Sequence, residues 1–184
     1  RSKQTGVSRR CSISGGDEMI TVELEDADVE RILARLSASL SDMSEVMNEI
    51  GEHLEFETLK RFEDGVAPDG TPWAPKSPTT IAAYERRGQT VDVRPLFGPN
   101  VDGQPLRSSF FRDYGPDFVE LGTNKIYSAV MQFGAAKGAF GTNARGGSIP
   151  WGNIPARPFL GISDQDRLNI AAIVEEWLQD IVED

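Results

Sequence analysis

The sequence predicts an α+β fold, and three features of its 184 residues support that prediction. A short alternating segment leads into a long apolar stripe with helical spacing, a hairpin pattern follows later, and an amphipathic helical pattern closes the chain. Elements of both kinds pack as layers around a shared hydrophobic core. We expect one domain over residues 19–184, because this length supports one substantial core.

Residues 1–18 are polar, basic and rich in Ser and Gly, without periodicity. This composition predicts a disordered leader. We interpret the leader as vector-derived or upstream sequence before a natural start at Met19. Residues 19–25 then alternate apolar and polar side chains, which predicts a half-buried strand.

One continuous helix is predicted from Val29 to Phe62, begun by Asp26 or Asp28 and ended by Gly65. Its apolar stripe consists of residues spaced four and three apart: Val29, Leu33, Leu36, Leu40, Met43, Met47, Ile50 and Leu54. The stripe could pack on the sheet of the same chain, with part of the helix in a subunit contact. A coiled-coil seam is the alternative.

The middle of the chain is punctuated by Pro and Gly, which predicts flexible loops at 64–77, 89–105 and 134–148. Within the first loop, Trp73 is expected to be a packing anchor rather than a binding hot spot. Ser77 and Pro78 predict the cap and first residue of a short helix that reaches about Arg87.

A hairpin is predicted between residues 110–114 and 118–122, joined by Gly-Pro-Asp. Residues 127–133 fit a strand or a short helix, and their composition favours the helix. Ser163 and Asp166 have the spacing of a helix cap, so the last helix should follow to about Val182. Its expected buried stripe is Ile170, Ile173, Val174, Trp177, Leu178 and Ile181.

Charge and composition argue against several functional classes. The net charge is −10 in total and +2 for residues 1–18, so the remainder carries −12 and repels phosphate backbones. We therefore expect at most a weak DNA contact. The apolar runs are too short to span a membrane, and a single cysteine excludes an intrachain disulfide.

Little in the sequence indicates catalysis. His53 is the only histidine, which leaves one candidate for a general base or an imidazole metal ligand. The loop 134–148 is rich in glycine but lacks a phosphate-binding motif. We predict no catalytic residue, no cofactor and no metal site, and expect His53 to be a partly exposed structural residue.

Five segments in order carry a resemblance to a known family: P-D-G-T-P-W-A-P (68–75), L-R-S-S-F (106–110), V-E-L-G-T-N (119–124), Y-S-A-V-M-Q-F-G (127–134) and I-P-A-R-P-F-L-G-I-S (154–163). Together they resemble the virion-morphogenesis or tail-completion proteins of Mu-like contractile-tailed phages. They are distantly similar to the neck and tail-completion proteins of siphophages. The resemblance covers essentially Ile20 to Asp184.

This resemblance implies a small, mostly antiparallel sheet crossed by one long N-terminal helix, with a C-terminal amphipathic helix alongside. It implies a non-enzymatic structural protein of tail completion or head–tail joining, located in the virion tail or neck after assembly in the bacterial host cytoplasm. The implied partners are further copies in a ring, with a hexamer as one arrangement, and tail-tube, terminator and head-connector proteins. A hydrolase of unknown substrate and a weak DNA-contacting module remain as alternatives.

The candidate assembly residues are aromatic or basic side chains outside the two long amphipathic segments: Trp73, Tyr127, Phe133, Lys137, Phe140, Arg145, Trp151, Arg157 and Phe159. For the segment around Arg157 and Phe159, two roles are open. It can lock the last helix in place, with Phe159 and Leu160 in the core and Arg157 bound to carbonyls or a carboxylate. It can also form a subunit contact.

Overall fold

The computed structural model describes residues 27–98 and 105–183 and confirms the α+β class. Its helices are α1 (Ala27–Ser41), α2 (Ser44–Asp64), α3 (Pro78–Arg86), the short 3-10 turn η1 (Leu106–Ser108), α4 (Ser128–Phe133) and α5 (Asp164–Glu183). Its two strands, β1 (Phe110–Tyr114) and β2 (Val119–Thr123), form an antiparallel hairpin. The leader and the strand predicted at 19–25 lie outside the described residues.

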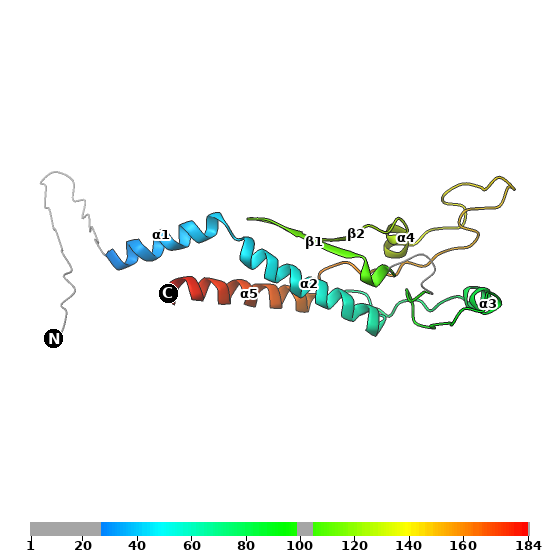
Figure 1. The fold of residues 1–184 in the computed structure, drawn as a ribbon, viewed down its shortest axis with the longest axis horizontal. Coiled ribbons are helices and arrows are strands. Elements are labelled where there is room, and N and C mark those ends of the chain that lie inside the picture. The colour runs from blue at the N-terminus through cyan, green and yellow to red at the C-terminus, as the bar shows by residue number, and fades with distance from the viewer. Residues whose placement is uncertain (1–26, 99–104, 184) are drawn as a thin grey trace, which may run out of the picture.

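The molecule is elongated, with the long helices α1, α2 and α5 toward one end and the short helices α3 and α4 with the irregular segments toward the other (Figure 1). α5 lies beside α2 and extends beneath α1, while the hairpin covers another side of α2. α3 and the loop after α4 occupy the far end of the long axis, away from the C-terminus. The predicted packing of the long helical segment on the sheet of its own chain is confirmed for α2.

The prediction of one continuous helix from Val29 to Phe62 is wrong at Asp42 and Met43. There the Asp42 carboxylate accepts a 3.1 Å hydrogen bond from Ser44 N and another from Ser44 Oγ, so a new helix begins. Met43 N donates to Pro116 O in the hairpin turn at 3.1 Å. A local contact between the Asp42 and Ser44 side chains and a tertiary hydrogen bond from Met43 therefore accompany the break, although the apolar spacing continues across it.

α2 and the hairpin pack closely together at Gly51. A Cβ atom at this buried position would lie 2.3 Å from Arg112 Cδ and 2.9 Å from Val119 Cγ2. Arg112 extends over the helix and donates to Glu55 Oε2 at 3.0 Å. The absence of a side chain at Gly51 thus leaves room for Arg112 and Val119 of the hairpin.

α2 ends as predicted at Gly65, which has φ 68°.

The core gathers segments that are far apart in the chain. It consists of Phe62, Ala67, Trp73, Leu106 and Phe159. The Phe62 ring meets Trp73 edge-on at 5.4 Å between centroids and packs against Phe159 at 5.6 Å. Trp73 is 5% exposed and its Nε1 donates to Pro158 O at 2.8 Å, so it is a packing anchor as expected.

Several local predictions are confirmed. Thr80 N donates to Ser77 Oγ at the start of α3, which has Pro at its first turn. The hairpin forms within one residue of the predicted strands, and residues 128–133 form a helix. At α5, Asp166 N donates to Ser163 Oγ at 3.0 Å while Ser163 N donates to Asp166 Oδ2 at 2.7 Å, a reciprocal cap.

The predicted apolar stripe of α5 is its less exposed face, but the stripe residues are less buried than expected. Its residues from Ile170 to Ile181 are half-buried, and Asp166 is the one buried residue within the described span of this helix. α1 similarly has no buried residue. Within the described residues, the main contacts of α5 are with α1 and α2. Both α1 and α5 therefore keep an exposed side there.

Candidate functional site

A buried ion pair joins α2 to α5. Arg61 and Asp166 are 6% and 1% exposed, and an Arg61 guanidinium nitrogen donates to Asp166 Oδ2. Arg61 also donates to Gly161 O at 2.8 Å. Burial alone would raise the pKa of Asp166, but the hydrogen bonds from Ser163 and the nearby Arg61 charge outweigh it, so the pKa lies below 3.8.

His53 borders this pair on α2. Its Nε2 lies 3.6 Å from Asp166 Oδ1 and 3.4 Å from the Asn169 side-chain nitrogen. The His53 side chain is 17% exposed, whereas that of Asp166 is 2% exposed. The carboxylate is thus occupied by protein groups and shielded from a substrate. This arrangement fits the expected structural role of His53.

The segment before α5 is held by two side chains. Arg157 donates from Nε to Ala74 O at 2.8 Å and from a terminal nitrogen to Pro75 O at 3.0 Å. Gln132 accepts from Phe159 N and Leu160 N, and its amide nitrogen donates to Leu160 O at 2.8 Å. Phe159 is 1% exposed. The geometry supports the locking role for this segment.

Arg157→Lys is predicted to lower the free energy of unfolding by about 1–3 kcal/mol. A lysine cannot replace both guanidinium hydrogen bonds in a fixed plane, so a part-buried carbonyl loses its donor. Urea unfolding measures the loss. Arg145→Lys, on an exposed residue of the loop after α4, is the matched control and should change stability by less than about 0.5 kcal/mol. Equal effects of the two substitutions would contradict the locking role.

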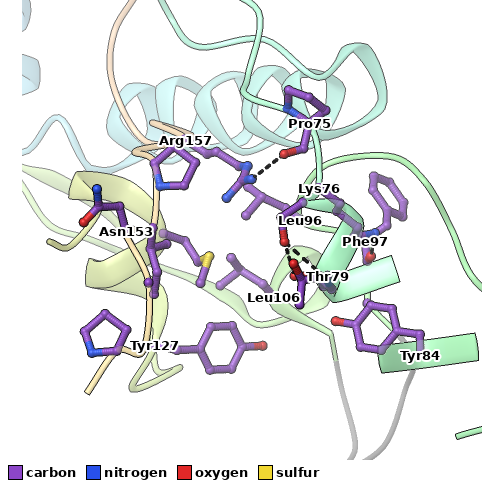
Figure 2. A pocket seen from close by; sticks show the side chains of 18 of the residues that line it. Pro75, Lys76, Thr79, Tyr84, Leu96, Phe97, Leu106, Tyr127, Asn153 and Arg157 are labelled. Carbon is purple, nitrogen blue, oxygen red and sulfur yellow. Dashed lines mark hydrogen bonds between the residues drawn. The ribbon is translucent and has the colours of Figure 1, made fainter. Parts of the chain in front are cut away.

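A groove of about 850 Å³ opens beside this locked segment (Figure 2). Its walls come from α3, the turn at 96–98, η1, α4 and residues 150–157. Tyr84 of α3 and Tyr127 before α4 point toward one another across it, and Leu96 and Leu106 also line it. Burial raises the pKa of the Tyr127 hydroxyl. The groove is aromatic and apolar inside, which suits a protein or peptide surface.

Lys76 supports one wall of the groove. Its ammonium donates to three backbone carbonyls, those of Asp92, Arg94 and Phe97, the bond to Arg94 O being 2.7 Å long. Burial lowers the pKa of Lys76. Hydrogen bonds from the Arg94 side chain and backbone lower the pKa of Asp92 to about 2. These contacts order residues 92–97 although no helix or strand passes through them.

Residues 134–153, here called the arm, follow α4 and project from the end of the molecule (Figure 1). Backbone bridges join Thr142 to Ser148 and Ala135 to Ile154. The Asn143 side chain accepts from Arg145 N and Gly147 N, both at 2.9 Å, and closes the tip. The flexibility expected for 134–148 stays a prediction.

The structure divides the nine candidate assembly residues into two groups. Three have buried side chains: Trp73, Arg157 and Phe159. The other six are exposed on the arm or next to it: Tyr127, Phe133, Lys137, Phe140, Arg145 and Trp151. Phe133 and Trp151 are 79% and 69% exposed, which is unusual for large apolar side chains. Tyr127 and Trp151 also line the groove, so the arm and the groove form one surface.

Sequence reasoning missed Arg61, Gln132 and Lys76. The position of Arg61 beside the apolar Phe62, near the end of the predicted helix, was a sequence signal that its side chain could be buried. The helical cap at Asp166 was recognised, but its ion pair joins residues 105 positions apart. Gln132 and Lys76 bind backbone carbonyls and amides, a role that leaves no spacing pattern.

Within the described ranges, no group of three or more His, Cys, Asp or Glu side chains is placed to hold a metal ion. A helix both long and apolar enough to cross a membrane is likewise absent from those ranges.

Comparison with known proteins agrees with this picture. The family model of the phage virion morphogenesis family matches residues 24–179. A relative in Haemophilus influenzae, Mu-like prophage FluMu G protein 2, is 28% identical over 162 residues, which cover 88% of this chain and 97% of the relative. No solved structure matches the chain significantly. Because the family model matches well over half of the chain, including every described helix and strand except the last residues of α5, the chain belongs to the phage virion morphogenesis family.

Proposed function

We propose that this protein is a structural subunit of phage tail completion or head–tail joining, within a ring-like neck or tail-terminus assembly of the virion. It joins other virion proteins and transforms no substrate. The observation that carries the proposal is the exposed apolar surface at the arm end. It consists of Ile126, Tyr127, Phe133, Phe140, Ile149 and Trp151, which are between 40% and 98% exposed.

Such a surface favours assembly for a physical reason. Each large aromatic side chain left in water forgoes about 1.5–3 kcal/mol of burial free energy. A cluster of them next to an apolar groove marks a surface that another protein covers. Membership of the virion morphogenesis family supports the proposal that the partners are other components of a phage virion.

The enzyme alternative receives no comparable support. A catalytic site needs convergent polar groups that a substrate can reach. In the described ranges, His53 and Asp166 come closest to such a pair, but Asp166 is 1% exposed and already bound to Arg61 and Ser163.

DNA binding is also less well supported than protein assembly. Lys76 and Arg157 line the groove, but both bind backbone carbonyls of their own chain. Lys137 and Arg145 of the arm are exposed cations without a phosphate-binding helix beside them. We expect binding that falls steeply with salt and disappears near physiological ionic strength.

The test uses the phage or prophage that encodes the protein. Deleting the gene should leave heads and tails that fail to join, or tails that are incomplete, in electron micrographs of lysates. A plasmid copy should restore plaques, whereas the double variant Phe140→Ser with Trp151→Ser should not. If each aromatic contributes about 2 kcal/mol to a contact, its loss weakens binding roughly 30-fold.

The matched control is Phe56→Ser, which replaces a 64% exposed aromatic on α2 away from the arm. It should complement like the wild type. Thermal unfolding must show that the double variant folds normally. Normal plaque counts from a deletion mutant, or joined and infectious particles without the protein, would refute the proposed function.

A further inference from the structure

The groove is positively charged, whereas the whole protein has a negative net charge. Among the described residues that line it are three cationic side chains, Lys76, Arg87 and Arg157, and no carboxylate. The described residues between α2 and α5, 65–98 and 105–163, hold ten Lys and Arg but six Asp and Glu, a net charge of +4. In a chain of net charge −10, the described segment between α2 and α5, which supplies all the groove residues, is locally positive.

The opposite charge is concentrated on the long helices. α2 and α5 contain thirteen Asp and Glu but three Lys and Arg, a net charge of −10. Toward its C-terminus, α5 has Glu175, Glu176, Asp180 and Glu183, and no basic residue stands in its last turn. The carbonyl end of a helix is already negative, so these carboxylates lie where they destabilise an isolated helix. A cationic surface against this end would remove the penalty.

This end of α5 is also apolar on its open side. Val182 is 46% exposed next to Glu183, while Trp177 and Ile181 are half-buried. The result is an acidic helical end with an uncovered aliphatic side chain. It complements a groove lined by Tyr84, Phe97 and Trp151 with Arg87 at its margin.

The two complementary surfaces cannot meet within one molecule. The C-terminal end of α5 lies under α1, whereas α3, η1 and α4, which contribute residues to the groove, lie toward the other end of the long axis (Figure 1). α5 is anchored to α2 by the Arg61–Asp166 pair, so it does not swing across. A contact between them therefore needs two copies.

We propose that the last turns of α5 of one copy dock in the groove of the next. This inference rests on the proposed function and specifies the contact between neighbouring copies of the protein in the assembly. Asp180 and Glu183 face Arg87 and the positive field of the groove, and Val182 covers its aromatic lining. Because the two faces differ, the contact is heterologous, and its repetition forms a ring if the rotation closes.

The test is an exchange of charge on the full-length chain. Arg87→Glu changes the groove face, and Asp180→Arg with Glu183→Arg changes the helical end. Each variant alone should self-associate roughly tenfold more weakly than the wild type in sedimentation equilibrium at low salt. An equimolar mixture should recover wild-type association, since each copy then meets an oppositely charged face. Glu85→Arg, an exposed change on α3 outside the groove lining, is the control and should have little effect.

A second measurement covers weak association. In a background where Cys11, the one native cysteine, is replaced by Ser, one protein carries Trp151→Cys and the other Glu183→Cys. A bismaleimide should link the two different proteins into a dimer far more than it links either protein to itself. The reaction is run at the highest concentration that stays soluble, and raised salt should reduce it.

No recovery in the mixture together with no preferred cross-link would overturn the inference, while plaque complementation would still measure the proposed function separately. Duplex DNA that binds the wild type at physiological salt, is lost in Arg87→Glu and competes with the cross-link would assign the groove to nucleic acid instead. Failure of complementation with an intact cross-link would refute the virion role and leave the self-contact standing.

Discussion

Phe62→Ala is expected to lower the free energy of unfolding by about 3–5 kcal/mol. Phe62 is 1% exposed and its ring contacts Trp73, Phe110 and Phe159. Truncation would leave a cavity at the point where α2, the first loop, the hairpin and the segment before α5 meet. These four segments are held by one another rather than by a large sheet, so they have little other burial to compensate.

Urea unfolding followed by circular dichroism measures this effect. Phe56→Ala lies on the same helix, but its side chain is 64% exposed, so it should change stability by less than about 0.5 kcal/mol. A small effect at Phe62, or an equal effect at both positions, would mean that the aromatic cluster does not carry the stability of the fold.

Asp166→Ala is expected to cost a similar amount, about 3–5 kcal/mol, because it leaves the Arg61 charge buried without its partner. It also removes the acceptor of the Ser163 N–H bond at the start of α5. Asp164→Ala removes an exposed carboxylate from the same helical turn and should cost less than about 1 kcal/mol. The double variant Arg61→Leu with Asp166→Leu should recover part of the loss, since it leaves no unpaired buried charge.

The same pair predicts the pH dependence of stability. The pKa of folded Asp166 lies below the ordinary value of an aspartate, because the hydrogen bonds from Ser163 and the Arg61 charge outweigh the effect of burial, so the unfolded chain binds this proton more readily. The stabilising contribution is therefore fully present above about pH 4 and is lost as the pH falls through the folded pKa. Asp166→Asn should flatten the decline of stability below about pH 4. An unchanged slope would show that other carboxylates cause the acid sensitivity.

Local chemistry explains which parts of the fold were predictable. Ser77 with Pro78 and Ser163 with Asp166 are caps formed by neighbours in sequence, and both are confirmed. The hairpin follows from alternation around Gly115 and Pro116. Each of these features depends on contacts between residues a few positions apart. Such contacts require particular residue types at short spacings, which can be recognised in the sequence.

Other features depend on distant residues. The helix break at Asp42 is stabilised in part by Met43 donating to Pro116, across the hairpin turn. The groove is lined by Lys76, Leu106, Tyr127 and Trp151. These residues lie in separate segments of the chain, and no sequence pattern links them. The candidate assembly residues were chosen as aromatic or basic side chains. The sequence indicated a packing role for Trp73 and left two roles open for Phe159, but no pattern showed that Phe133 and Trp151 would be exposed.

By itself, the sequence determined the α+β class, the hairpin, the helix caps and the order of motifs typical of virion morphogenesis proteins. The tertiary structure alone decided which aromatic side chains fill the core, where the long helix breaks, and that a positive groove and an acidic helix end lie at opposite ends of the molecule. The physical reason is that local hydrogen bonds and apolar periodicity act between neighbours in sequence. Burial and long-range charge complementarity arise only after distant segments have packed.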